Sequence, residues 1–99
     1  MNIGQAIQTI RKGKNLSQKK FSKVVGIDQS YLSLIENNKK KPSTKLLEKI
    51  SYKTKTPLPI VFFFSLSEED VSPEKKELFN ILFPRIKDMV CEIFETPEK

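Results

Sequence analysis

Apolar side chains recur every three or four residues along most of the chain, a spacing typical of amphipathic helices. In the first such stretch they are Ile3, Ala6, Ile7 and Ile10, which predicts a helix over residues 3–13. No stretch alternates apolar and polar residues as a strand would, and no internal repeat is present. The pattern therefore predicts an all-α fold.

Residues 16–38 read as two short helices separated by one glycine. Ser17 offers an N-cap hydroxyl to the first, whose apolar positions are Phe21, Val24 and Val25. Gly26 can adopt the positive φ that ends a helix, and Asp28 can cap the next one. In that second helix, Leu32 and Ile35 form the buried face and Asn37-Asn38 stops the helix. This arrangement is a helix-turn-helix, which is a binding device rather than an active site.

Proline and serine residues divide the rest of the chain. Ser43 precedes a fourth helix that breaks at 56–59, and Pro59 suits the first turn of a short helix from 60 to about 65. An acidic connector leads to Ser72-Pro73, where a last helix begins and runs to about residue 95. Pro84 lies inside this helix, and we favour one kinked helix over two separate ones.

Charge is distributed unevenly along the 99 residues. Through Thr56 there are thirteen basic and three acidic residues, a net charge of +10, whereas the rest carries −4. The basic part indicates an acidic partner such as nucleic acid, and the opposite signs indicate two regions with different roles. We expect one DNA-binding domain over 1–65 and a connector with a dimerisation helix over 66–99.

Composition argues against several other classes of protein. Cys91 is the only cysteine and histidine is absent, so a disulfide, a multi-cysteine metal site and the usual general base are not expected. We therefore predict no catalytic residues, no metal, no cofactor and no enzyme activity. The longest apolar run, 60–64, is too short to cross a membrane, and the N-terminus lacks a signal-peptide pattern. We expect a cytoplasmic protein.

The outward face of the helix over 28–37 is short, uncharged and hydrogen-bonding apart from one leucine. An ordinary solvated helix is the alternative, although such a helix would more often carry Glu and Lys on that face. A face of this kind can enter a major groove and contact base edges. We expect four residues to read bases: Gln29, Ser30, Ser33 and Leu34.

Basic clusters lie before and after this helix, which favours the DNA-binding interpretation. Cations can hold the phosphate backbone while neutral groups read sequence. The first helix of the motif also presents free backbone N–H groups at its N-terminus, which suit a phosphate oxygen. We expect phosphate contacts from Gln18, Lys19, Tyr31, Asn37, Lys39, Lys40, Lys41 and Ser43.

Taken together, residues 3 to about 64 resemble the helix-turn-helix domain of the phage-repressor type, the Cro/cI or XRE family. The resemblance is carried by Leu16-Ser17-Gln18, Phe21, Val25-Gly26-Ile27, Ser30-Tyr31-Leu32-Ser33, Ile35-Glu36-Asn37, Lys39, Pro42 and residues 46–50. It implies a five-helix domain that inserts its third helix into the major groove, usually as a dimer on a pseudo-palindromic operator. The sequence departs from the family pattern at three places. The family often has glycine at the position of Asn38, alanine at the position of Ser22, and apolar residues with a glycine at residues 54–56.

The C-terminal third carries more apolar side chains than one small core can accept. Either the last helix packs back on its own domain, or it forms a two-fold dimer interface with the fifth helix, and the two arrangements can coexist. The expected interface residues are Phe62, Phe63, Phe79, Phe83, Ile86 and Val90. We predict a homodimeric regulator of transcription, most simply a repressor bound to double-stranded DNA. The alternative is an antitoxin-like autoregulator whose C-terminal part binds a second protein.

Overall fold

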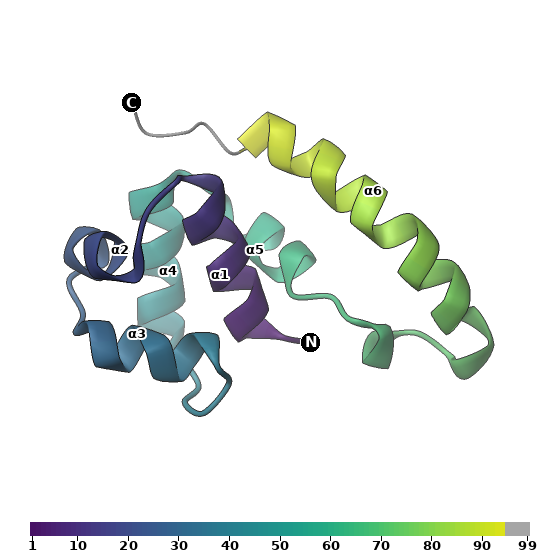
Figure 1. Ribbon diagram of the computed structural model, residues 1–99, viewed down its shortest axis with the longest axis horizontal. Helices are drawn as coiled ribbons and strands as arrows, with labels where there is room; N and C mark the ends of the chain where they lie inside the picture. The colour runs from purple at the N-terminus through teal and green to yellow at the C-terminus, as the bar shows by residue number, and fades with distance from the viewer. Residues whose placement is uncertain (95–99) are drawn as a thin grey trace.

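Five short helices pack around two apolar clusters in the computed structural model, and a sixth, longer helix lies alongside them (Figure 1). The structure describes residues 1–94, and no strand occurs among them, which confirms the all-α prediction. Two 3₁₀ turns, η1 (Glu68–Asp70) and η2 (Pro73–Lys75), lie between the fifth and sixth helices. The helices are α1 (Ile3–Gly13), α2 (Gln18–Val25), α3 (Gln29–Glu36), α4 (Thr44–Thr54), α5 (Leu58–Phe64) and α6 (Lys76–Phe94).

Side chains at the helix starts supply the caps that the sequence predicted. Ser17 Oγ accepts the Lys20 N–H at 3.1 Å, and Ser43 Oγ accepts the Leu46 N–H at 3.1 Å. Each bond satisfies a backbone donor that has no partner within its own helix. The fifth helix starts at Leu58, two residues before the predicted start at residue 60.

Two buried clusters hold the helices together. The larger lies among α1, α2, α3 and α4, and the smaller lies between α1 and α5 with Ala6, Ile10, Val61 and Phe64. The prediction that Val24 belongs to the apolar face of α2 is wrong, because its side chain is exposed. Successive helical positions differ by about 100°, so the neighbouring Val25 faces the cluster and Val24 does not. The larger cluster contains Ile7, Phe21, Val25, Leu32, Ile35, Leu46, Leu47 and Ile50.

The corner between α4 and α5 is closed by polar contacts where the family pattern has apolar residues and a glycine. Lys55 adopts the left-handed conformation with φ 56°, which glycine takes more easily. Thr54 is buried and its hydroxyl donates to the Ile50 carbonyl at 2.7 Å. The Ser51 hydroxyl donates to the Thr56 carbonyl at 2.6 Å. The departures from the family pattern therefore change which groups hold the corner together, and the corner itself is kept.

The connector after α5 is bonded to the N-terminus and to α6. The Met1 ammonium group donates to Asp70 Oδ1 at 2.9 Å, and this bond, with a second from the Ser67 N–H, holds the pKa of the Asp70 carboxyl below its usual range. Asn80 Nδ2 donates to Glu68 Oε2 at 2.8 Å, which ties η1 to α6. The stretch predicted to be a plain acidic connector is therefore a structured turn.

The last helix runs through Pro84 as one element, α6, and the alternative of two separate helices is not observed. Its predicted end at residue 95 lies outside the described residues. None of its residues is fully buried. Pro84 N lacks a hydrogen, so it cannot bond to the Asn80 carbonyl, and both residues are exposed.

Candidate nucleic-acid interface

The outward face of α3 carries the four side chains expected to read bases. Gln29 and Ser30, in the first turn, are exposed. Ser33 is half-buried, and Leu34 keeps 38% of its surface exposed. These side chains lie on one helix, so its outward surface offers hydrogen-bonding groups and one apolar contact without a formal charge. A helix with this surface matches what base edges in a major groove can accept.

A tight turn fixes α3 against α2. Gly26 has φ 83° and its N–H donates to the Ser22 carbonyl at 2.7 Å. Ser22 is buried, and its hydroxyl donates to the Lys19 carbonyl at 2.8 Å, so the serine fits where the family often has alanine. Asp28 takes the N-cap position of α3 as predicted, although its side chain makes no capping hydrogen bond.

A buried ion pair fixes the end of α3 to α1. The Arg11 guanidinium donates to Glu36 through Nε (2.7 Å) and Nη2 (3.1 Å), and their side chains are only 10% and 2% exposed. Arg11 Nη1 also donates to the Leu16 carbonyl at 2.9 Å, and Gln18 Nε2 donates to Glu36 Oε1 at 3.1 Å. One carboxylate thus connects α1, α2 and α3, and a bidentate pair of this kind is geometrically specific.

Asparagine side chains close the loop after α3. Asn38 adopts φ 60°, its Oδ1 accepts the Gly4 N–H at 3.2 Å, and its Nδ2 donates to Asn2 Oδ1 at 2.9 Å. A Cβ atom on Gly4 would lie 2.4 Å from the Ile35 carbonyl oxygen, so the start of α1 touches the backbone of α3. This close approach, together with the ion pair, holds both ends of α1 against α3.

Neither Arg11 nor Glu36 was predicted to position the site: both entered only the net charge, and Glu36 was also one of the residues that carry the family resemblance. The helical period carried a usable signal. Arg11 follows the buried Ile7 by four residues and Glu36 follows the buried Leu32 by four, so both fall on buried faces. Two opposite charges on facing buried positions are expected to pair.

Exposed lysines lie on both sides of α3 in the chain. Lys19, Lys20 and Lys23 project from α2, and the loop after α3 carries residues 39–41, all exposed lysines. The two clusters give the surface around α3 a concentrated positive charge. Phosphate contacts of this type supply most of the affinity of a protein for DNA and make it depend on salt.

The remaining residues expected at phosphates also have roles within the chain. Gln18 contacts Glu36 through one amide hydrogen, and Tyr31 is half-buried against the larger cluster. Asn37 Nδ2 donates to the Ser33 carbonyl at 2.8 Å, and the Ser43 hydroxyl accepts the Leu46 N–H. These contacts fix the orientation of each polar group in advance of any ligand.

The residues expected at a dimer interface divide into two groups. Phe62 and Ile86 are exposed. Phe63, Phe79, Phe83 and Val90 are half-buried within their own chain. The Phe63 and Phe83 ring centroids lie 5.3 Å apart, and Val90 packs with Cys91 against the smaller cluster. One side of α6 therefore packs back on its own domain, which is one of the two arrangements that the sequence predicted.

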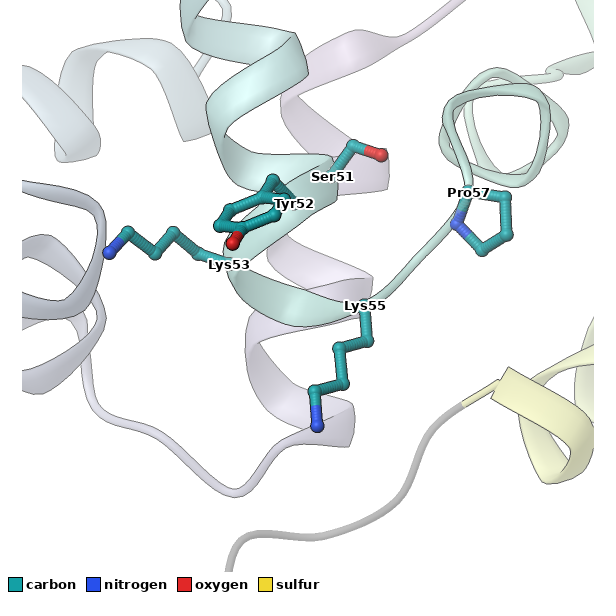
Figure 2. A pocket seen from close by; sticks show the side chains of 5 residues that line it. All are labelled: Ser51, Tyr52, Lys53, Lys55 and Pro57. Atoms are coloured by element: carbon teal, nitrogen blue, oxygen red, sulfur yellow. The ribbon is translucent and has the colours of Figure 1, made fainter.

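A shallow hollow of about 560 Å³ lies at the end of α4, lined by Ser51, Tyr52, Lys53, Lys55 and Pro57 (Figure 2). The Tyr52 ring is 80% exposed there. The loop that follows α3 joins the opposite end of α4, about 16 Å away along its eleven residues. This hollow is therefore separate from the α3 surface.

Within residues 1–94, no helix is long and apolar enough to cross a membrane, and no metal-ligand cluster of three or more His, Cys, Asp or Glu residues occurs.

Comparison with known proteins gave a family and two relatives. The chain is 43% identical over 49 residues to the ImmF control region 10 kDa protein of Bacillus phage phi105, covering 50% of this chain and 54% of that protein. It is 34% identical over 76 residues to Antitoxin PezA of Streptococcus pneumoniae serotype 4, covering 77% of this chain and 42% of that protein. The chain thus spans about half the length of these curated relatives. No solved structure gives a significant match.

The family model that matches is that of the helix-turn-helix, over residues 7–59, which is more than half of the chain. This span contains α2, α3 and α4 complete, with the turn at Gly26 and the buried Glu36. The exposed neutral face of α3, the lysine clusters and the family match agree with one another. The chain belongs to the helix-turn-helix family of the phage-repressor (XRE) type, a family of DNA-binding transcriptional regulators.

Proposed function

We propose that this protein binds a pseudo-palindromic operator as a homodimer and represses transcription, with α3 in the major groove. The observation that carries the proposal is the exposed neutral face of α3 between two exposed lysine clusters. The likeness to a phage protein named for a control region supports a regulatory role. In this proposal residues 1–65 bind DNA and residues 66–99 hold two copies together.

Base reading falls to the four outward residues of α3. Gln29 carries a terminal amide that can pair with adenine through its donor and acceptor together. Ser30 and Ser33 can donate or accept, and Leu34 can contact the methyl group of thymine. Because Leu32 and Ile35 are fully buried, rotation of α3 would cost core packing, so the four side chains keep their direction.

Groups around α3 bind the phosphates in this proposal. Lys19 and the lysines of 39–41 are exposed and can approach the backbone on either side of the groove. Gln18 retains a second amide hydrogen while its first contacts Glu36. Tyr31, Asn37 and Ser43 complete the proposed set of contacts. These groups would fix register and orientation without reading sequence.

Selection of bound sites from a pool of random duplexes tests the proposal. We expect a short enriched half-site that occurs twice as an inverted repeat, with centres about one helical turn of DNA apart. Titration at several salt concentrations should give an affinity that falls steeply as salt rises. Binding that shows no sequence preference at moderate salt would contradict the proposal.

A second candidate function is an antitoxin-like autoregulator whose C-terminal part binds a partner protein. The match to Antitoxin PezA favours it, because a match of 76 residues is longer than the part of this chain before residue 66 and so includes C-terminal residues. Limited proteolysis of the purified protein distinguishes the two. A segment over 66–99 that is cleaved rapidly favours the antitoxin-like role, and a segment that stays intact argues against it.

A further inference from the structure

The outward side of α6 carries an apolar stripe that remains exposed among residues 1–94. Leu82, Ile86, Met89 and Ile93 follow one another at intervals of four, three and four residues, which is the heptad spacing of paired helices. Met89 is 67% and Ile93 is 73% exposed. A surface helix gains nothing from such a stripe unless another apolar surface covers it.

We propose that this stripe pairs with the same stripe of a second copy, with the two α6 helices antiparallel about a two-fold axis level with Lys87 and Asp88. This inference rests on the proposed homodimer and assigns its contacts. It moves the interface away from Phe63 and Val90, which pack on their own domain, keeps Ile86, and adds the outward aliphatic residues of α6.

The register follows from matching the exposed apolar positions in layers. An axis between residues 87 and 88 places Leu82 opposite Ile93 of the second copy and Ile86 opposite Met89 of the second copy. Symmetry repeats both layers, so all eight side chains of the two stripes are covered. A shift by a single residue would oppose apolar with polar positions.

A shallow hollow beside α6, also lined by Val71 and Lys75, lies where this register places a side chain. Its volume is about 310 Å³, and its lining includes Phe79, Leu82, Phe83 and Ile86. These positions stand at i, i+3, i+4 and i+7, the four residues that form a hole for one side chain of a facing helix. In the antiparallel register the side chain at this point is Ile93 of the second copy.

Charge complementarity favours the antiparallel orientation over the parallel one. Arg85 and Glu92 are both exposed and lie a heptad apart along one edge of the stripe. With antiparallel helices, Arg85 lies beside Glu92 of the second copy, and symmetry forms this pair twice. With parallel helices, Arg85 would instead face Val90 of the second copy, which already packs against its own domain.

The other surfaces of α6 are compatible with this pairing. Phe83 and Val90, on the opposite edge of the stripe, contact their own domain. Pro84 lies on the far side of the helix, about 160–200° from Leu82 and Ile86, so the missing hydrogen bond is away from the second copy. The helix would therefore be enclosed between its own domain and its symmetry mate.

Charge reversal in the full chain tests the register. Sedimentation over a concentration series should show a dimer, and Arg85→Glu or Glu92→Arg should each weaken it about tenfold, because each creates two like-charged contacts. The double variant Arg85→Glu/Glu92→Arg should return the dissociation constant to within about twofold of the unmodified chain. Glu77→Arg, a matched reversal on the far side of α6, should leave the dimer unchanged.

Three results would overturn the proposal: an unmodified chain that stays monomeric, a double variant as weak as the single ones, or a control that weakens the dimer equally. Circular dichroism of each variant verifies that the exposed substitutions leave the helices intact. Titration with a single half-site duplex separates this proposal from the DNA-binding one. A dimer that binds its half-site and is unaffected by the charge reversals contradicts only the pairing, whereas a dimer that the reversals weaken but that shows no sequence preference contradicts only the proposed DNA recognition.

Discussion

Two kinds of side chain meet DNA in the proposed complex, and their removal should have different consequences. Gln29→Ala removes a bidentate base contact, so we expect a loss of about 1–3 kcal/mol on the preferred site and relaxed specificity at one base pair. Lys40→Ala removes a phosphate contact, so we expect all sequences to weaken alike and the salt slope to fall by about one.

Binding titrations on a small panel of duplexes, each changed at one base pair, measure both effects. Lys53→Ala provides the control for Lys40→Ala, because this exposed lysine lies at the end of α4 away from the loop after α3. A Gln29→Ala variant that loses the same affinity on every duplex would show that Gln29 does not read a base.

Two residues with positive φ should respond oppositely to glycine. Lys55→Gly relieves the left-handed backbone at a position without a capping side chain, and we expect a gain of about 0.5 kcal/mol in the free energy of unfolding. Asn38→Gly relieves the same backbone but loses the bonds to Gly4 and Asn2, so we expect a loss of about 2 kcal/mol. Urea denaturation measures both, and equal changes in the two variants would refute the role given to the Asn38 amide.

The ion pair between Arg11 and Glu36 should be expensive to break from one side. Glu36→Gln leaves the buried guanidinium without a counter-charge, and we expect a loss of about 3 kcal/mol in the free energy of unfolding. Glu48→Gln makes the same change on an exposed position of α4 and should cost less than about 0.5 kcal/mol. A Glu36→Gln variant as stable as the Glu48→Gln variant would mean that the pair does not hold α1 to α3.

At the scale of elements, the contact between α1 and α3 depends on the absence of a side chain. Gly4→Ala would place a Cβ 2.4 Å from the Ile35 carbonyl oxygen and 2.8 Å from that of Glu36, so one helix must move. We expect a loss of about 2 kcal/mol or more despite the better helix propensity of alanine. Thermal unfolding measures it, with Gln5→Ala on the exposed side of α1 as the control, and an unchanged midpoint would contradict the close approach.

The sequence predicted the elements well because their signals are local. Ser17, Gly26 and Ser43 act within one helical turn, and their bonds are those expected from residue type and position. The helical periods of α1 and α4 also place the correct side chains inside. For the same reason the outward face of α3 could be predicted, since burial of Leu32 and Ile35 determines it.

The rest depends on contacts between elements distant in sequence. The exposure of Val24 and the need for glycine at position 4 follow from which helices meet, and no local pattern reports that. The same limit applied to α6. Its apolar stripe was visible, but which of its edges faces the domain was decided only by the contacts of Phe83 and Val90.

At the scale of the whole molecule, the separation of charge matches a separation of surfaces. The lysines of α2 and of residues 39–41 flank α3 in the chain, whereas α6 lies beside the domain at the other end of the view in Figure 1 and carries the apolar stripe. A DNA-facing surface that contacts one half-site gives modest affinity. A second copy linked through α6 would make binding of the second half-site effectively intramolecular.

This linkage predicts that a substitution far from α3 changes operator binding. Met89→Asp places a charge in the proposed helix pair, so we expect the chain to become monomeric and its affinity for the full operator to fall about 100-fold. Its midpoint of unfolding at low concentration and its affinity for a single half-site should stay unchanged, because Met89 is exposed. Ile81→Asp is the matched control, since Ile81 is an exposed apolar residue of α6 outside the stripe. If both variants bind the full operator equally well, the affinity for two half-sites does not come from this face of α6.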